Sequence, residues 1–336
     1  MQKTESVLRT FGIKGAIDQV ALFGYGHIND SYKVKLENES LLLQRINTSI
    51  FELDKPLEKN LVKLFSLDTS LFPHHFKANN KIHFGDKNGL WRLSAFIENS
   101  YSPLNPGFEE TLEAVKGYGQ FMALNHSLDV DEFAETIPHF HHLGRRLNCL
   151  AKAAKVDKAS RVDEVQKELN LVEEFSWIEE QFAALMKADL PLRVCHNDTK
   201  STNVLLDETS KALLKVVDLD TVGPGYALYD FGDMMRSMLA SHPENEPDIE
   251  SLEVLEDRFE HMLETYIESS GGLLTKEEID SLGFGGLYMT YIMAIRFLTD
   301  YLNGDTYYRI AYPDENLVRA KNQLKLLGLI KGMMNL

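Results

Sequence analysis

The sequence contains few cysteines and an excess of acidic over basic residues. Only Cys149 and Cys195 occur among 336 residues, without the CxxC spacing typical of zinc sites. Lys and Arg total 35 against 51 Asp and Glu, which gives a formal net charge of −16. Proteins that bind nucleic acid generally present a basic surface, so no nucleic-acid partner is expected. A disulfide framework and a cysteine-ligated metal are likewise not expected.

Long apolar runs are also missing. The longest uncharged apolar stretch, 283–295, ends at Arg296. A membrane span needs about 20 apolar residues, so we interpret this stretch as a buried core helix. Residues 1–6 are polar and do not resemble a signal-peptide core. We therefore predict a cytoplasmic protein that does not contact membranes, and no obligate protein partner is evident.

The hydrophobic residues, 44% of the chain, suffice for a large core, and the length of 336 residues indicates two domains or one two-lobed unit. Alternating apolar residues predict strands at 31–37, 41–46, 81–85 and 90–97, the last two joined by an Asn88-Gly89 hairpin turn. A helix is expected at 54–65. The Pro- and Gly-containing segment 102–107 marks a boundary. Beyond it, one β-type segment, about 192–222, interrupts helical patterns at 108–127, 161–187, 229–241, 249–270, 276–302 and 314–333.

These patterns predict an α+β protein with two lobes. Residues 1–102 are expected to form a small N-lobe with an antiparallel β-sheet and one helix. Residues 103–336 are expected to form a larger, mainly helical C-lobe. The β-type segment within that lobe is the expected place for a functional loop, because its part 194–205 is the densest stretch of residues that can carry chemistry.

The segment 194–205 carries the pattern His-x-Asp followed by Asn five positions later, as His196, Asp198 and Asn203. Phosphoryl transfer to a hydroxyl group needs a carboxylate that orients the hydroxyl and accepts its proton. It also needs oxygen ligands for Mg²⁺, and an Asn carbonyl oxygen suits this cation. Asp198 is therefore predicted as the catalytic base and Asn203 as a metal ligand.

A second acidic motif, Asp218-Leu219-Asp220, begins 20 positions after Asp198 and ends a β-type run. A carboxylate at the end of a strand can point into a cleft. Asp218 is therefore predicted as the second metal ligand, bridging to the phosphates of a nucleotide. The alternative, that these acids are surface turns of a hairpin, is weakened by the occurrence of both motifs at this spacing.

Together, these motifs resemble the catalytic loop and metal motif of the aminoglycoside phosphotransferase and choline kinase superfamily, whose fold is protein-kinase-like. The chain resembles most closely the N-acetylhexosamine 1-kinases of that superfamily. Segments that carry this resemblance run nearly end to end: 24–29, 43–48, 135–141, 191–203, 218–221, 229–233, 296–302 and 312–319.

The resemblance implies ATP-dependent phosphorylation of the anomeric hydroxyl of N-acetylglucosamine or N-acetylgalactosamine, with Mg²⁺ as cofactor. It also implies that His27, Arg296 and Tyr312 lie near the sugar together with Asp198. For Arg296 the chemistry agrees, because a guanidinium that follows an apolar helical run needs a partner or a ligand. A salt bridge to Asp300, four residues further on, is the alternative.

Nucleotide binding is expected in the N-lobe. Gly24 and Gly26 can form a turn whose backbone amides approach phosphate oxygens, although a third glycine is lacking. Arg45 occupies the position where protein kinases carry a phosphate-pairing lysine, and Glu58 is predicted as its acidic partner. The nucleotide base is expected at the hinge backbone near Phe96 and Glu98.

Two further patterns suggest sites that we interpret differently. His139, His141 and His142 have no carboxylate or cysteine at a matching spacing, so a polar loop is favoured over a metal site. Asp230-Phe231-Gly232 spells the magnesium motif of protein kinases but follows Asp218 and lies in a helical pattern. Asp230 is therefore predicted to begin a helix and to accept hydrogen bonds from the catalytic loop.

Two alternatives to the hexosamine kinase remain open at this point. The catalytic motifs are equally compatible with another small hydroxyl acceptor, such as choline, an aminoglycoside or a different sugar. An inactive nucleotide-binding protein is disfavoured, because it would not need Asp198, Asn203 and Asp218 together. The sequence does not define the preferred hexose, the anomer, the nucleotide or the oligomeric state.

Overall fold

Alternating apolar residues in the first hundred positions form an antiparallel sheet. In the computed structural model, which describes residues 2–24, 29–48, 56–67, 69–86 and 89–336, the main path of this sheet runs β1-β2-β3-β6-β4. Its strands are β1 (Ile17–Leu22), β2 (Asp30–Leu36), β3 (Ser40–Ile46), β6 (Gly89–Ala95) and β4 (His75–Phe76), with β5 (His83–Asp86) also paired to β6.

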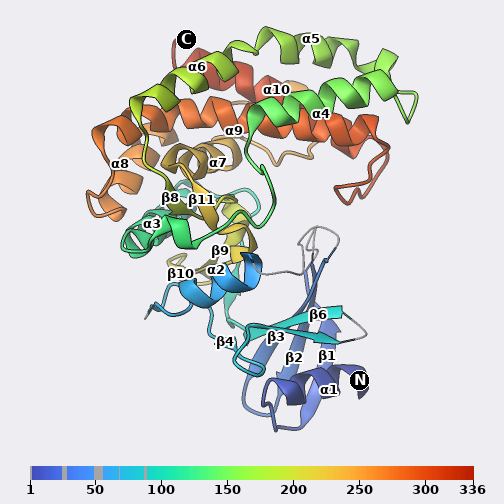
Figure 1. Ribbon diagram of the computed structural model, residues 1–336, viewed down its shortest axis with the longest axis vertical. Coiled ribbons are helices and arrows are strands. Elements are labelled where there is room, and N and C mark those ends of the chain that lie inside the picture. The colour runs from blue at the N-terminus through green and yellow to red at the C-terminus, as the bar shows by residue number, and fades with distance from the viewer. Residues whose placement is uncertain (1, 25–28, 49–55, 68, 87–88) are drawn as a thin grey trace.

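One face of this sheet is covered by α1 (Gln2–Thr10) (Figure 1). Leu8 of α1 packs with Val34, Leu41, Leu43 and Leu93 in a small core of its own. The hairpin predicted at Asn88-Gly89 is confirmed by the pairing of Asp86 with Gly89, while residues 87 and 88 lie outside the described part of the chain. The opposite face of the sheet is turned toward the C-lobe.

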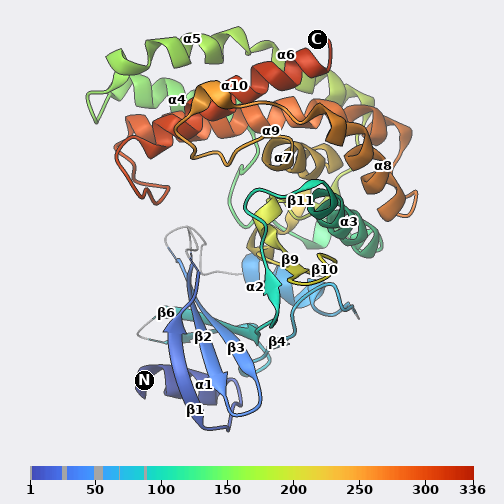
Figure 2. The same ribbon diagram turned by 180° about the vertical axis from the view of Figure 1, so that it is seen from behind.

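The next helix, α2 (Pro56–Leu64), belongs by its packing to the C-lobe. Leu57, Leu61 and Leu64 are buried in the large C-lobe core. Asn60 donates hydrogen bonds to the carbonyl oxygens of Ala134 (2.7 Å) and Val222 (2.8 Å). Figure 2 shows α2 beside β9 (Val204–Asp207) and β10 (Leu213–Val216).

The short strand β7 (Ser100–Tyr101) also pairs with β9 of the C-lobe. Contacts therefore assign both α2 and β7 to the C-lobe, although they precede the boundary predicted at residue 102. The reason is physical: helix amphipathicity predicts that one face is buried, but not which surface covers it.

The C-lobe is built around α9 (Lys276–Leu302), which begins and ends where the sequence predicts. By length and composition it is the one described helix that could span a membrane, but 83% of its apolar window is buried inside the protein, as expected of a core helix. Its neighbours are α4 (Leu143–Val156), α7 (Ala227–Met238) and α10 (Glu315–Met333).

Glycines allow α7 and α9 to cross closely. A Cβ atom at Gly232 would lie 2.1 Å from the carbonyl oxygen of Gly285, and one at Gly285 would lie 2.1 Å from that of Leu228. These distances leave no space for any side chain. The crossing fixes the start of α7, which carries Asp230, against the centre of the lobe.

The remaining helices differ in part from the predictions. α3 (Phe108–Asn125) and α8 (Phe259–Ser269) lie within predicted segments, although α8 begins later, after short 3₁₀ turns. The predicted helix at 161–187 is divided into α5 (Gln166–Glu174) and α6 (Trp177–Leu185), and α4 was not predicted. The core-facing residues of α4, Leu143, Leu147, Leu150 and Ala154, do recur at helical spacing, so the sequence carries a signal for this helix. The two-lobed, kinase-like fold itself is confirmed.

Candidate active site

The catalytic loop lies between two small antiparallel pairings, β8 (Arg193–Cys195) with β11 (Gly223–Gly225), and β9 with β10. Asp230, in the first turn of α7, is hydrogen-bonded to this loop. Its carboxylate accepts hydrogen bonds from the backbone amides of His196 (2.9 Å) and Asn197 (2.8 Å). The predicted role of Asp230 as a buried partner of the loop is thus confirmed.

Asp198 lies at the surface of the cleft, where two neighbours fix its carboxylate. The side-chain amide of Asn203 donates to Oδ2 (2.7 Å), and Lys200 Nζ lies 3.1 Å from the same oxygen. Burial alone would raise the pKa of Asp198, but the positive charge of Lys200, the neighbouring His196 and the hydrogen bonds outweigh it and lower the pKa to about 2. The carboxylate is therefore fully ionised at neutral pH.

Asp218 has a left-handed backbone conformation (φ +58°) and precedes the 3₁₀ turn Leu219–Thr221. Its side chain is accessible to water, but it lies within the cleft and has protein on several sides. This enclosure and the charges of Asp220 and Asp198 raise the pKa of Asp218 to about 6, while Lys200 and Arg92 act in the opposite direction. A carboxylate destabilised in this way gains from a bound cation.

A backbone hydrogen bond connects Asn203 to the residue that precedes Asp218. The backbone amide of Val217 donates to the carbonyl oxygen of Asn203 (2.9 Å), and the ring of His196 donates through Nε2 to the carbonyl oxygen of Val217 (3.0 Å). The side-chain nitrogen of Asn203 is hydrogen-bonded to Asp198, so the side-chain oxygen of Asn203, Oδ1, is the atom that can ligate a cation. These two oxygen donors fit Mg²⁺, whose other ligands are usually water and phosphate.

Beside Asp198 and Asp218 a pocket of about 90 Å³ opens toward the C-terminal helices, and Arg296 of α9 lines it. Aromatic rings surround the Arg296 guanidinium: its carbon lies 4.6 Å from the ring centre of Phe140 and 5.5 Å from that of Tyr308. Arg296 Nη1 also lies 3.3 Å from the sulfur of Met293. This half-buried cation contacts rings and a thioether inside the candidate acceptor pocket.

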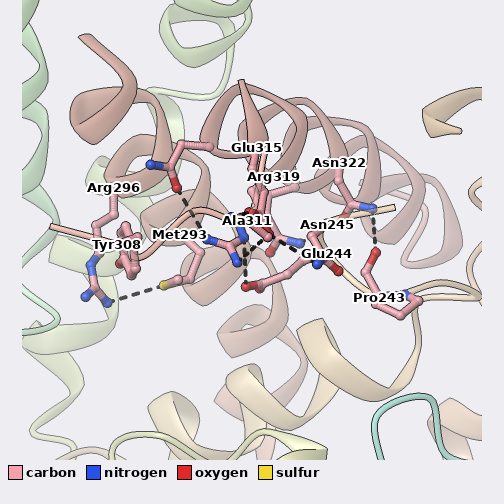
Figure 3. A network of polar contacts seen from close by, with 12 residues as sticks. Pro243, Glu244, Asn245, Met293, Arg296, Tyr308, Ala311, Glu315, Arg319 and Asn322 are labelled. Carbon is pink, nitrogen blue, oxygen red and sulfur yellow. Dashed lines mark hydrogen bonds and ion pairs between the residues drawn. The ribbon is translucent and has the colours of Figure 1, made fainter. Parts of the chain in front are cut away.

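Another wall of the pocket is a network of charged side chains, of which Figure 3 shows Arg319, Glu315 and Glu244. Arg319 lies between Glu315 (2.9 Å) and Glu244 (3.8 Å), and Arg236 pairs with both Asp233 (2.8 Å) and Glu244 (2.7 Å). Arg236, Glu244, Asp233 and Arg319 all line the pocket. Each acid of this wall thus has an arginine partner.

Within the described part of the chain, Arg296 forms no ion pair of 4.0 Å or less, unlike the other cations that line the pocket. The alternative salt bridge to Asp300 is wrong. Asp300 instead accepts hydrogen bonds from the backbone amides of Thr306, Tyr307 and Tyr308. It thereby fixes the loop whose rings surround Arg296.

Of the other residues predicted near the sugar, neither Tyr312 nor His27 is found among the described residues that line the pocket. Tyr312 donates to the carbonyl oxygen of Asn245 (2.8 Å) and does not line the pocket, whereas Tyr307 and Tyr308 do. His27 lies outside the described residues. Nothing in the sequence pattern indicates that Tyr307 and Tyr308, rather than Tyr312, reach the pocket.

A larger cavity, about 560 Å³, shares Ile137, Phe140 and His141 with this pocket, and Asp198 does not line it. His141 lines both cavities, is buried, and donates through Nε2 to the carbonyl oxygen of Asn197 (2.9 Å). Burial and the nearby Arg296 lower its pKa to about 3, so the ring is neutral. His141 supports the catalytic loop, a role that its sequence context does not indicate.

On the N-lobe side, Gly24 has a left-handed conformation (φ +72°), while Gly26 lies outside the described residues. At the hinge, the Phe96 ring lies under Lys33 (3.8 Å) and packs edge-on against Phe23. Glu98 pairs with Lys33 (2.9 Å) at the surface. Lys33 of β2 thus contacts both residues predicted near the nucleotide base.

Arg45 is not in the position expected of a phosphate-pairing cation. It is opposite Trp91 in the sheet register and shares its face with Leu43, the face that α1 covers. Its guanidinium lies 4.0 Å from Asp30, and Glu58 instead accepts from the ring and backbone of His83. The expectation for Arg45 failed because adjacent strand residues point to opposite faces of a sheet.

Gln44 and Arg92 occupy the face that the cleft uses. Arg92, on β6, donates to Gln44 (2.8 Å) and forms a buried ion pair with Asp220. The sequence analysis did not single out Arg92. The signal was present, since an arginine in a buried strand requires an acidic partner.

Comparison with known proteins agrees with this geometry. The profile of the APH phosphotransferase enzyme family matches residues 19–262. A probable choline kinase from Arabidopsis thaliana is 25% identical over 135 residues, which cover 40% of this chain and 36% of that relative.

Solved structures show the same fold along nearly the whole chain. A choline/ethanolamine kinase family protein from Mesorhizobium loti is similar with a TM-score of 0.62 at 14% identity, covering 98% of this chain and 95% of the other. A spectinomycin phosphotransferase in complex with ADP and its antibiotic gives a TM-score of 0.61 at 11% identity, with 98% of each chain covered. Since the family profile matches most of the chain, including the catalytic loop and Asp218, this protein belongs to the APH phosphotransferase enzyme family and is a phosphotransferase.

Proposed function

We propose that this phosphotransferase transfers the γ-phosphoryl group of ATP to the anomeric hydroxyl of an N-acetylhexosamine, N-acetylglucosamine or N-acetylgalactosamine. The observation that carries the proposal is Arg296. It lines the pocket beside Asp198, contacts aromatic rings, and forms no ion pair in the described part of the chain. A guanidinium in this state can donate hydrogen bonds to sugar oxygens, and the adjacent rings can pack against the sugar.

Charge pairing in the pocket favours a neutral acceptor. The acids Asp220, Asp233 and Glu244 are each paired with an arginine, and Asp198 is paired with Lys200. A cationic acceptor would therefore compete with protein cations for every acid except Asp218. We assign Asp218 to the metal, so an ammonium group has little to bind. A preference for a neutral acceptor agrees with the resemblance of the outer sequence segments to hexosamine 1-kinases.

In the proposed reaction Asp198 accepts a hydrogen bond from the sugar hydroxyl and orients its oxygen toward the γ-phosphorus. The new O–P bond forms as the bond to the leaving ADP oxygen breaks, and the hydroxyl proton passes to Asp198. Because the pKa of Asp198 is about 2, proton transfer is expected late, after most of the bond change. Mg²⁺ held by Asn203 and Asp218 would neutralise charge on the phosphates.

The nucleotide is proposed to bind in the cleft between the N-lobe sheet and the C-lobe. Gly24 is then near the phosphates, and the backbone of Phe96 and Glu98 contacts the base. Gly26 and His27 remain proposed contacts to phosphate and sugar, and Tyr312 is proposed at the outer edge of the sugar site. Placement of the reaction in the cytoplasm, with no nucleic-acid, membrane or obligate protein partner, is part of the same proposal.

An amino alcohol such as choline is the second candidate, because several similar proteins are named as choline or ethanolamine kinases. One experiment distinguishes the two. ADP release is measured by a coupled assay over N-acetylhexosamines, other hexoses, choline and aminoglycosides, and the product is identified by ³¹P NMR. We expect a sugar 1-phosphate. A phosphate on O6, or higher kcat/KM for choline, would contradict the proposal.

A further inference from the structure

A buried ion pair joins the N-lobe sheet to the segment that carries Asp218. Arg92 and Asp220 are 3% and 1% exposed, respectively. The guanidinium of Arg92 contacts both carboxylate oxygens of Asp220, with Nη2 3.3 Å from Oδ2. Asp220 is separated from Asp218 by a single residue, so the pair ends next to the proposed metal site.

Further hydrogen bonds hold the pair from the N-lobe. Gln44 of β3 accepts from Nε (3.2 Å) and Nη2 (2.8 Å) of Arg92. Asn29 donates to Asp220 (2.9 Å) and accepts from the backbone amide of Asn47 (2.9 Å). Three N-lobe side chains therefore determine where the carboxylate of Asp220 lies.

The residues on either side of Asp218 are attached to the C-lobe instead. Val217 is bonded through its backbone to Asn203 and His196, and the hydroxyl of Thr221 donates to the carbonyl oxygen of His196 (2.8 Å). Between these anchors Asp218 has its left-handed conformation, and Asp220 reaches to the other lobe. The segment 217–221 is thus held from both sides of the cleft.

Asp220 cannot serve as a metal ligand in this arrangement, because Arg92 and Asn29 occupy its oxygens. It has another use. If Asp220 were replaced by an uncharged residue, the buried guanidinium of Arg92 would lose its acidic partner. Asp218 is the adjacent acid that could then pair with Arg92. A buried, unpaired guanidinium is costly, so Asp218 would be drawn toward Arg92 and away from the phosphates.

We propose that Arg92 and Asp220 are a positioning pair that couples the N-lobe sheet to the metal-binding segment, so that Asp218 is correctly placed for the metal–nucleotide complex only while the pair is intact. The inference rests on the proposed metal role of Asp218. It is independent of which acceptor the enzyme uses, so its test needs no acceptor.

The test measures the Kd of ADP for the full chain by calorimetry, with excess Mg²⁺ and separately with EDTA. For Asp220→Asn we expect Kd to rise at least 10-fold with Mg²⁺ and less than 2-fold with EDTA. Asp305→Asn is the control, because Asp305 also pairs with an arginine, Arg161, but does not line the pocket beside Asp218. It should lower thermal stability without changing either Kd more than 2-fold.

Arg92→Lys keeps the charge but loses the two-pronged contact, and we expect an intermediate rise of Kd confined to Mg²⁺. This variant also decides the matter if Asp220→Asn does not fold. Equal losses with Mg²⁺ and EDTA would show a direct phosphate contact or general damage, and unchanged Kd values would show a merely structural pair. Either outcome overturns the proposal.

Discussion

The side-chain amide of Asn203 donates a hydrogen bond of 2.7 Å to the carboxylate of Asp198. The proposed base and a proposed metal ligand are thus in direct contact. A change at Asn203 is therefore expected to affect both the metal and the orientation of the base, whereas a change at Asp218 acts through the metal alone.

Asn203→Ala and Asp218→Ala are both expected to raise the Mg²⁺ concentration needed for half-maximal activity. Asp218→Ala should be the more severe, because it removes a charged ligand. Asn203→Ala should in addition lower kcat at saturating Mg²⁺, since Asp198 loses a fixed hydrogen bond. Titrations of initial rate against Mg²⁺ measure both effects. Unchanged titrations in both variants would exclude the metal assignment.

Asp198→Asn is expected to keep the fold and nucleotide binding while kcat falls by roughly 10²-fold or more, the scale of losing a positioned base. Asp280→Asn is a matched control, because Asp280 is an exposed acid at the start of α9. Circular dichroism and ADP binding verify the fold of both variants. Turnover of Asp198→Asn within a few-fold of wild type would refute its role.

Arg296→Ala should raise KM for the sugar far more than KM for ATP. Loss of a hydrogen bond from a charged donor costs about 1–3 kcal/mol, which corresponds to roughly a 5- to 150-fold change. Arg309→Ala is the control, because Arg309 is exposed on the same loop and does not line the pocket. Equal changes of both KM values would indicate a general loss of structure.

Asp218→Asn is expected to stabilise the metal-free protein above pH 6. The folded-state pKa of Asp218, about 6, is higher than its ordinary value, so its ionisation destabilises the fold as pH rises from about 4 to 6. Asn removes this penalty and tolerates the left-handed backbone. In EDTA we expect the melting temperature of the variant to exceed that of wild type by roughly 1–3 °C at pH 7.5. The difference should shrink by pH 4.5, and a constant difference would contradict the assignment.

Gly285→Ala tests the close crossing of α7 and α9. The added methyl group would collide with the Leu228 carbonyl oxygen, so we expect a loss of about 3 kcal/mol in the free energy of unfolding. Gly328→Ala is the matched control in α10, where a Cβ atom meets nothing within 4 Å. It should stabilise by up to about 1 kcal/mol through helix propensity. Denaturant unfolding measures both, and similar values for the two variants would exclude the close-contact explanation.

Much of the site could be predicted because its chemistry is local in sequence. The spacing of Asp198, Asn203 and Asp218 reflects one loop and one hairpin, and Asp230 could be placed because a helical pattern surrounds it. The reaction class follows from these positions. The acceptor does not, because it depends on how separate helices and loops come together around Arg296.

What could not be predicted depends on contacts between distant segments. Arg92 and Asp220 are 128 residues apart, and nothing near either residue indicates the other. Arg45 was assigned by its strand, but the choice of face depends on a single-residue shift of register. Asp300 matched the helical spacing for Arg296, yet its carboxylate is used by the backbone of the loop 306–308.

The attachment of α2 to the C-lobe has a consequence for regulation. Three leucines of α2 are buried in the C-lobe core, and each contributes about 1.5–3 kcal/mol. Swinging this helix out would therefore cost roughly 5–9 kcal/mol, and a population shift of that size requires a ligand that prefers one state by about 10⁴-fold or more. On–off control by displacement of this helix is accordingly not expected in this enzyme.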